Sequence, residues 1–257
     1  MRVGDFTVYF GASSGSSRKV LRELKEPDVM INYATRDNKP FDTIKRLFTD
    51  SGGYSFMKGK GEYQTTNGEY LDYIETHQPE RFALRDYPCE PDVLESHNRT
   101  VSDHLNRTVR AHVDLLDEYE DRSLPSEPMA VIQGWEVADY VRHIDMLRDA
   151  GVLTGVVGVG SVCRRNATGE ILDVLNAVSR ELSGNTRMHA FGVRLDVLRE
   201  DYPSKLTSVD THSYDYRARY HCADYYDGRK GWRDVAFHYL KQRDKMKRAL
   251  YPEHGGA

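Results

Sequence analysis

Short apolar runs alternate with longer polar segments along most of the chain. Apolar runs of about four to eight residues bounded by turns are typical of strands, and the polar segments between them repeat apolar residues at helical spacing. This alternation predicts βα units around a parallel sheet. The predicted strands are residues 7–11, 28–33, 46–50, 81–85, 129–133, 155–160, 188–193 and 206–210.

The segments between these strands indicate helices with different clarity. Residues 17–26, 135–150 and 167–182 each carry apolar side chains at helical spacing. Residues 92–120 predict one long helix, or two with a break, whereas residues 36–45 predict no more than a turn of helix. Eight strands joined in this way predict an α/β fold, a (β/α)8 TIM barrel.

Composition agrees with one barrel and argues against a membrane protein. The chain has 257 residues, of which 39% are hydrophobic and 30% charged, and its net charge is −4. Because single barrels commonly have this length, we expect residues 1–257 to form one catalytic domain. No apolar run reaches the ~18 residues of a membrane span, and the N-terminus lacks a signal peptide. We therefore expect a cytoplasmic protein, in the host cytoplasm if it is viral.

The three cysteines, Cys89, Cys163 and Cys222, are odd in number and far apart. Such cysteines predict neither a disulfide framework nor a structural zinc site, and they suit a reducing compartment. Cys163 is expected to be a small buried residue rather than a nucleophile. We expect no metal.

The segment 217–250 differs in charge from the rest of the chain. It holds ten Lys and Arg residues against four acids, although the whole chain has a net charge of −4, and aromatic residues lie between them. Such a segment is typical of a surface that contacts a phosphate backbone. It is equally compatible with a solvated helix that packs its aromatic side chains on the barrel. The candidate nucleic-acid contacts here are Arg217, Arg219, Lys241, Lys245 and Lys247.

Polar residues suited to chemistry gather where the predicted strands end, which is where a barrel of this kind builds its active site. Asp50, Asp86 and Asp210 end or follow three strands, and Gln133 ends a fourth. Carboxylates and amides bind the edge of a nucleobase, aromatic faces pack on its ring, and a carboxylate can attack a sugar carbon. The set is compatible with glycosyl transfer at a nucleobase without singling it out. Further candidates are Tyr54, Gly134, Gly160, Ser161, Arg164, Arg165 and Phe191.

Each candidate also has a structural interpretation. Asp50 and Asp210 are suited to capping the segments that follow them, and Asp86 to fixing its own loop. Gln133 needs hydrogen-bond partners on a buried strand in any case. The alternatives left open are phosphate binding or salt bridges for Arg164 and Arg165, ring binding or core packing for Tyr54 and Phe191, and substrate contact or a surface turn for His212.

Taken in order, these strand ends resemble the tRNA-guanine transglycosylases. The shared series is Asp-Ser-Gly-Gly-Tyr at 50–54, an acid at 86, Val-Ile-Gln-Gly at 131–134, a glycine-rich turn and a late Asp at 210. Residues 158–165, 189–193 and 208–210 are more similar to the 7-deazaguanine DNA transglycosylases, phage and bacterial relatives that act on DNA, and residues 10–11 and 30–33 carry the same similarity. The resemblance covers most of the chain.

This resemblance implies a function. The protein would exchange guanine in DNA for a free 7-deazaguanine base of the preQ0/preQ1 type, a modification associated with restriction evasion. Asp210 matches the nucleophile and Asp50 the general acid/base, while Asp86 and Gln133 match the residues that read the base edge. No cofactor is implied, because two successive displacements conserve the energy of the glycosidic bond.

The resemblance also implies the walls of the base pocket. Gly160, or Val159 one residue earlier, matches the backbone donor to the base carbonyl, with Gly134 and Ser161 adjoining. Tyr54 and Phe191 match the aromatic pair that sandwiches the ring.

Two departures from the tRNA enzymes bear on the substrate. Those enzymes carry a Cys-x-Cys-x-x-Cys and His zinc site near the C-terminus, where this chain has only Cys222, and the chain leaves no room for an appended RNA-binding domain. Both departures favour DNA and leave the oligomeric state open, since the zinc subdomain lies near the family's dimer contact. The alternatives are a tRNA-guanine transglycosylase acting on tRNA, or a non-catalytic nucleic-acid-binding protein on the same fold.

Overall fold

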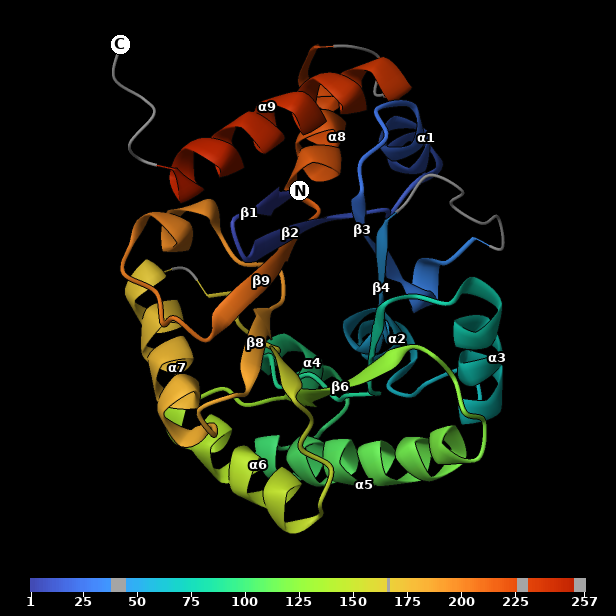
Figure 1. Ribbon diagram of the computed structural model, residues 1–257, viewed down its shortest axis with the longest axis vertical. Helices are drawn as coiled ribbons and strands as arrows, with labels where there is room; N and C mark the ends of the chain where they lie inside the picture. Colours follow the sequence, from blue (N-terminus) through green and yellow to red (C-terminus); the bar gives the residue numbers. More distant parts are fainter. Residues whose placement is uncertain (38–44, 166, 226–230, 252–257) are drawn as a thin grey trace.

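The computed structural model describes residues 1–37, 45–165, 167–225 and 231–251, without the side chains of Val3 and residues 222–225. Eight parallel strands form a closed barrel within a ring of helices (Figure 1). The barrel closes because the first of them pairs with both the second and the last. The predicted (β/α)8 fold is confirmed.

All eight predicted strands are present, with ends that differ by a few residues. A short additional strand, β1 (Arg2–Val3), was not predicted and pairs antiparallel with the first barrel strand. The barrel strands are β2 (Phe6–Gly11), β3 (Asp28–Asn32), β4 (Arg46–Asp50), β5 (Arg81–Ala83), β6 (Glu127–Ile132), β7 (Val156–Val159), β8 (Arg187–Ala190) and β9 (Leu206–Thr211).

The long segment 92–120 contains two helices, α4 (Pro91–Ser96) and α5 (Val101–Glu120). Asn98 has a positive φ of 47°, which ends the first helix. Thr100 and Asp103 then form a capping box, in which each side chain accepts from the other's backbone N–H. The sequence therefore encodes a stop and a new start between the two helices.

The other predicted helices are confirmed, and two were missed. The confirmed helices are α1 (Gly15–Glu23), α6 (Val137–Asp149) and α7 (Thr168–Glu181). The missed helices are α2 (Gly53–Lys60) and α3 (Asn67–His77). The glycines of α2 are typical of turns, so its sequence did not indicate a helix. The predicted turn of helix at 36–45 falls mostly on residues 38–44, outside the described residues.

The apolar core has two layers, separated by the strands. Tyr9, Met30 and Phe48 point into the barrel, where they pack with Met129 and Phe191. Their neighbours along the strands point outward and meet the helices, as the alternation of side chains along a strand requires. The inner layer therefore supplies an apolar floor for whatever lies at the open end of the barrel.

Helices α8 (Ser213–Tyr225) and α9 (Trp232–Leu250) follow the last strand and lie side by side on the barrel (Figure 1). Tyr239 of α9 packs on Phe10, with ring centroids 4.9 Å apart, and donates a hydrogen bond to Glu26. Phe237, by contrast, is 60% exposed. One face of this segment thus packs on the barrel and the other is solvated, while contact with a phosphate backbone stays a prediction.

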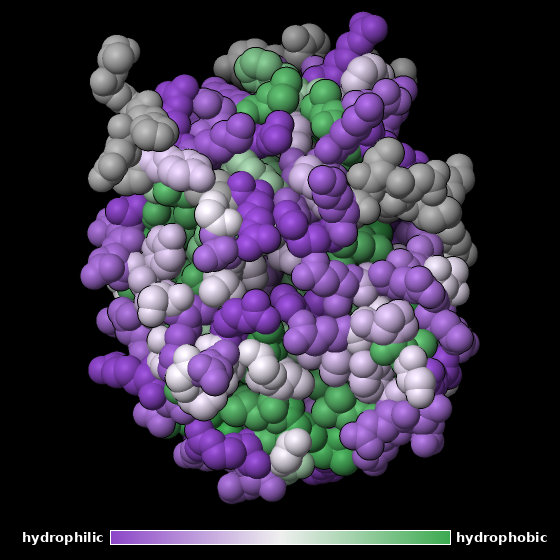
Figure 2. All heavy atoms as spheres, viewed as in Figure 1, coloured by the Kyte–Doolittle hydropathy of each residue, from purple (hydrophilic) through white to green (hydrophobic). Residues whose placement is uncertain are grey.

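Figure 2 shows that hydrophilic side chains cover most of the viewed face of the molecule. None of the helices in the described part of the chain combines the length and the apolar character needed to cross a membrane.

Candidate active site at the strand ends

A cavity of about 210 Å³ opens at the carboxyl ends of the barrel strands. Its lining comes from the carboxyl ends of β3, β4 and β9 and from the segments that follow β4, β5, β6, β7, β8 and β9. It brings together most of the predicted catalytic and base-binding residues. These are Asp50, Tyr54, Asp86, Gln133, Gly160, Ser161, Phe191 and Asp210.

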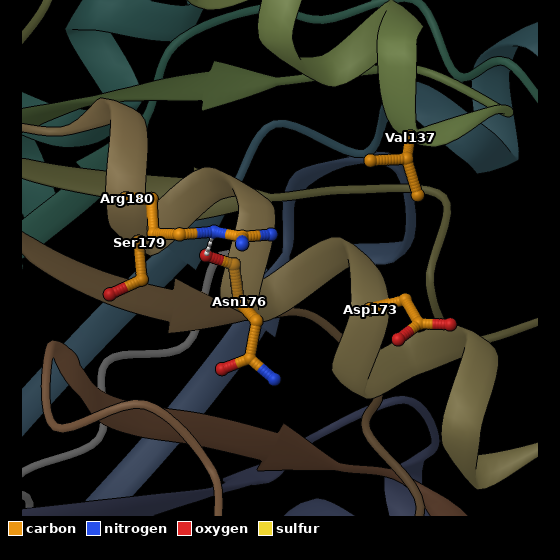
Figure 3. A pocket seen from close by; sticks show the side chains of 5 residues that line it. All are labelled: Val137, Asp173, Asn176, Ser179 and Arg180. Carbon is orange, nitrogen blue, oxygen red and sulfur yellow. Dashed lines mark hydrogen bonds between the residues drawn. The ribbon is translucent and has the colours of Figure 1, made fainter.

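A second depression, of about 610 Å³, lies between α6 and α7 and contains none of those residues. Figure 3 shows Val137 on one side, facing Asp173, Asn176, Ser179 and Arg180 across the groove. The two chargeable side chains, Asp173 and Arg180, are exposed, and Arg180 donates a hydrogen bond to the backbone of Asn176. Solvated groups of this kind carry no unusual chemistry, so the cavity at the strand ends is the candidate site.

Asp210 lies at the end of β9 and is only 2% exposed. The N–H of Gly192 donates to its Oδ1 over 2.8 Å. The ring of His189 lies beneath, with Nε2 3.4 Å from Oδ1, and His212 Nε2 lies 3.8 Å from Oδ2. Burial lowers the pKa of His189, which favours the neutral form of this ring beside Asp210.

Asp50 ends β4 and faces the same cavity. Its Oδ2 accepts a hydrogen bond from Asn32 Nδ2 at 2.7 Å. Burial and the charges of Asp86 and Asp210 raise the pKa of Asp50 to about 7. A carboxyl that is half protonated near pH 7 is suited to give and to take a proton.

The turn after Asp50 depends on glycine. Gly52 has a φ of 81°, and a Cβ there would lie 2.8 Å from the backbone nitrogen of Ala34. Only glycine adopts this conformation in so little space without strain. The Asp-Ser-Gly-Gly sequence therefore lets the chain turn directly from the strand into α2 while Asp50 stays at the cavity.

Asp86 and Gln133 meet on the cavity wall. Gln133 Nε2 donates to Asp86 Oδ2 at 2.6 Å, and the Ser51 hydroxyl donates to Oδ1 at 2.8 Å. Burial raises the pKa of Asp86, while these two donors oppose the rise. Tyr63 fixes the loop, because its hydroxyl accepts from the Asp86 N–H and donates to the Asp86 carbonyl oxygen.

Gly160 contributes space rather than a donor in this structure. Its N–H donates to Ile132 O at 2.9 Å, and its carbonyl accepts from Tyr140 at 2.9 Å. A Cβ at Gly160 would lie 2.3 Å from Gln133 Nε2. Since the Gly160 N–H is used within the sheet, the next residue, Ser161, presents the nearest alternative N–H, and no backbone acceptor for it is present among the described residues.

Gly134 is buried but is not part of the cavity lining. A Cβ there would lie 2.8 Å from the ring of Tyr140. The residue therefore allows α6 to approach β6, and its assignment as a base-binding residue stays a prediction.

Two aromatic residues border the cavity. Phe191 continues the apolar floor, with its ring centroid 4.8 Å from that of His189. Tyr54 lies at the rim, where the guanidinium of Arg164 stacks 5.0 Å from its ring centroid and contacts its hydroxyl. Both are partly exposed, as a surface that packs on a ligand ring must be.

Arg164 and Arg165 differ in exposure and in their contacts within the protein. Arg164 is exposed; it stacks on Tyr54 at the rim and lies 3.8 Å from Asp92 on α4. Arg165 stacks on Trp135 and donates to its carbonyl oxygen, so it is engaged within the protein.

The basic residues of the C-terminal segment lie outside the cavity. Arg217 and Arg219 lie on α8, which begins directly after the cavity residue His212. Lys241, Lys245 and Lys247 lie on α9, where Lys241 and Lys247 are exposed. Arg229 and Lys230, counted in the basic segment, lie outside the described residues.

No group of three or more His, Cys, Asp or Glu residues within the described part of the chain could hold a metal ion. Cys163 is exposed and lines the cavity, so the expectation that it is buried is wrong. The side chain of Cys222 lies outside the described residues.

Several residues of the site were not assigned a role from the sequence, among them Asn32, Tyr63, Glu90 and His189. Asn32 lies near the carboxyl end of its predicted strand, 28–33, so its position gave a usable signal, whereas His189 lies near the start of 188–193. Tyr63 and Glu90 come from loops and approach Asp86 and Ser161 only in the folded barrel. No local sequence pattern predicts such long-range contacts.

Comparison with known proteins identifies a family that matches most of the chain. A family model described as DpdA, DeoxyPurine in DNA protein A, matches residues 35–249, well over half of the chain. A search of curated proteins finds no match. The matched range contains Asp50, Asp86, Gln133 and Asp210.

Proposed function

Since this chain belongs to the DpdA family of 7-deazaguanine DNA transglycosylases, relatives of the tRNA-guanine transglycosylases, we propose that it exchanges guanine in DNA for a free 7-deazaguanine base through a covalent intermediate on Asp210. One observation carries the proposal. A single cavity holds two carboxylates from β4 and β9 together with the hydrogen-bonded pair Asp86 and Gln133. A sugar-attacking group and a base-reading edge are thereby combined in a space suited to one heterocyclic base.

In the first step, an Asp210 oxygen attacks the anomeric carbon of the deoxyribose and the bond to guanine breaks. Protonated Asp50 gives its proton to the departing base, and a glycosyl ester remains on Asp210. The hydrogen bond from Gly192 holds Oδ1, which leaves Oδ2 as the attacking atom. A carboxylate oriented in this way needs little reorganisation to react.

In the second step, ionised Asp50 takes a proton from the incoming base. The base nitrogen attacks the anomeric carbon, the ester bond breaks and Asp210 is released. The energy of the glycosidic bond is conserved in the ester, so no further energy source is required. The pKa of about 7 suits Asp50 to both steps, because both of its protonation states are populated near neutral pH.

Recognition of the base is assigned to the cavity wall. Guanine and 7-deazaguanine share one polar edge, with two neighbouring donors and a carbonyl acceptor. Asp86 would accept from the donors, and the N–H of Ser161 is the donor we assign to the carbonyl, in place of Gly160. Tyr54 and Phe191 would pack on the ring faces. The target guanine must leave the helix stack, at a cost of a few kcal/mol.

The test is base exchange in vitro. DNA with labelled guanine is incubated with the purified protein and a free 7-deazaguanine base, and its nucleosides are analysed by mass spectrometry. We expect the 7-deazaguanine nucleoside to appear as labelled guanine is released, and neither to occur with Asp210→Asn. Binding without exchange would favour the non-catalytic alternative, and exchange on tRNA alone would favour the tRNA alternative.

A further inference from the structure

A chain of buried hydrogen bonds connects Asp86 to a second carboxyl, Glu90. The Gln133 amide lies between Asp86 and Ser161, with Nε2 2.6 Å from Asp86 Oδ2 and Oε1 2.7 Å from Ser161 Oγ. Ser161 Oγ in turn lies 2.8 Å from Glu90 Oε2 and accepts from the N–H of Cys89 at 2.9 Å. Glu90 is 2% exposed and lines the cavity.

This series of hydrogen bonds needs one more hydrogen atom than the Gln133 amide and the Ser161 hydroxyl can supply. Each of the three contacts, Asp86 to Gln133, Gln133 to Ser161 and Ser161 to Glu90, needs one hydrogen atom. The amide supplies a hydrogen on one side only, because its oxygen faces the other side, and the hydroxyl of Ser161 supplies one. The third hydrogen must therefore come from a carboxyl group.

The orientation of Gln133 decides which carboxyl holds this proton. With Nε2 toward Asp86, as in the structure, Ser161 donates to Gln133 and Glu90 donates to Ser161. Exchanging the amide oxygen and nitrogen would instead require a proton on Asp86. The donors favour the first arrangement, because Asp86 then accepts from both Ser51 and Gln133. Burial also raises the pKa of Glu90.

We propose that Glu90 is protonated in the resting site and that its proton fixes Gln133 in the orientation that keeps Asp86 an ionised acceptor. Glu90 is thus a positioning residue that acts through Ser161 and Gln133. Resting on the proposed function, the consequence is selectivity for bases with two neighbouring donors, as in guanine and 7-deazaguanine. A base without the amino group, such as hypoxanthine, would leave one lone pair of Asp86 unsatisfied.

The surroundings of Glu90 favour its neutral form. A buried carboxyl group with no cation in contact is more stable in its uncharged form. Asp86 and Asp92 also raise the pKa of Glu90 by their negative charge. The titratable groups around it are Asp86, Cys89, Asp92, Tyr140 and Cys163, with Arg164 and Arg165 beyond them.

The direct test is the protonation state, which does not depend on catalysis. Infrared difference spectra at pH 7 compare the wild-type protein with E90Q and D86N. We expect a protonated-carboxyl band that E90Q removes. All three proteins carry Asp50→Asn as background, because the charge of Asp86 raises the pKa of Asp50 and D86N would otherwise change the Asp50 band as well. A band that persists in E90Q and disappears in D86N would place the proton on Asp86 and overturn the proposal.

The second test is affinity for the free base, measured by calorimetry without DNA. E90A should weaken binding of a 7-deazaguanine base about tenfold, as expected when a buried hydrogen-bond partner is removed. E90A should also reduce the ratio between the affinity for the 7-deazaguanine base and the affinity for the analogue without the amino group. E90Q should restore most of the affinity, because its amide donates the same hydrogen to Ser161.

The pH dependence of base affinity distinguishes a positioning role of Glu90 from a role in packing. In the wild type, affinity should fall at alkaline pH as the shared proton is lost, and E90Q should lack that limb. If E90Q loses as much affinity as E90A, or keeps the limb, the proposal is wrong. A protein that binds the base with the expected spectra but exchanges nothing would disprove the proposed function alone.

Discussion

The cavity and the C-terminal helices use charged and aromatic residues in opposite ways. In the cavity, Asp50, Asp86 and Asp210 are held by neighbouring donors at fixed positions. On α8 and α9, the charged side chains are mostly exposed, as is Tyr216 at 57%. Removal from water makes each cavity carboxylate sensitive to its partners, whereas solvated charges act through their sum.

This difference sets the size of the effects expected from mutation. The pKa of Asp50 rises to about 7 because water is replaced by two other carboxylates and few donors. Arg248 and Asp244 on α9 form an ordinary surface pair at 2.8 Å, and such pairs contribute little, about 0–1 kcal/mol. Single substitutions should therefore be decisive in the cavity and nearly silent on the helices.

The largest effect is expected for Asp210→Asn. The amide keeps the shape and can still accept from Gly192, but it cannot form the glycosyl ester. Exchange should fall on the order of 10³-fold or more, while DNA affinity changes little, as measured by mass spectrometry and fluorescence anisotropy. Asp196→Asn, at a partly exposed acid of the 3₁₀ turn Leu195–Arg199, is the matched control. Normal exchange by Asp210→Asn would refute the nucleophile assignment.

Asp50 should control the pH dependence of exchange. Formation of the glycosyl-enzyme needs protonated Asp50, so its rate should fall as pH rises through about 7; resolution needs the ionised form and should fall as pH drops through the same value. Asp50→Asn should lower exchange by about 10²–10⁴-fold and remove this dependence. Single-turnover rates measured on both sides of neutral pH separate the two steps. A wild-type profile that is flat across pH 7 would contradict the assigned role.

The basic surface should show a smaller effect that several residues share. Neutralising Lys241, Lys245 and Lys247 together should reduce the slope of log affinity against log salt by about one unit for each lysine that pairs with a phosphate. Exchange on saturating DNA should fall much less, because these residues lie outside the cavity lining.

The control for this surface neutralises three exposed arginines elsewhere, Arg110, Arg180 and Arg187. If both triple variants change the salt dependence equally, only overall charge matters. If neither does, α9 is simply a solvated face, and the DNA path lies elsewhere, with Arg164 as the first candidate.

The same carboxyl that serves catalysis should cost stability. The pKa of Asp50 is raised from 3.8 to about 7 in the folded state, so the folded chain resists its ionisation. This contribution is favourable at low pH and is lost as pH rises through about 7. Asp50→Asn should therefore stabilise the protein by on the order of 1–2 kcal/mol more at pH 8 than at pH 5, a value reduced for partial exposure.

Urea denaturation at the two pH values measures this difference. Asp92→Asn is the control without a pH-dependent effect. The contact with Lys58 lowers the pKa of Asp92, so this carboxyl is ionised at both pH values and removing the contact should slightly destabilise the protein by the same amount at each. A pH-independent effect of Asp50→Asn would show that the raised pKa is not felt in folding.

The sequence predicted the barrel because its strands are continuous apolar runs, and it predicted much of the site because the polar residues adjoin those runs. Other features needed the fold. Tyr63 and Glu90 reach the site through contacts far apart in sequence. The resemblance suggested Gly160 as a donor, but its N–H pairs with Ile132 across the sheet, which no motif reveals.

The smallest effect is expected from metal chelation, and it tests what holds the C-terminal helices in place. A structural zinc ion contributes on the order of 10 kcal/mol to folding, so removing it strongly destabilises a segment that depends on it. Here α9 buries Val235, Tyr239 and Met246 against the barrel, which is enough to dock a helix of this length. We expect elemental analysis to find less than stoichiometric zinc, and a chelator to leave thermal unfolding unchanged. One zinc per chain would contradict this expectation, and Cys222 with the neighbouring His221 and His238 rings, 5.3 Å apart, would be the first site to mutate.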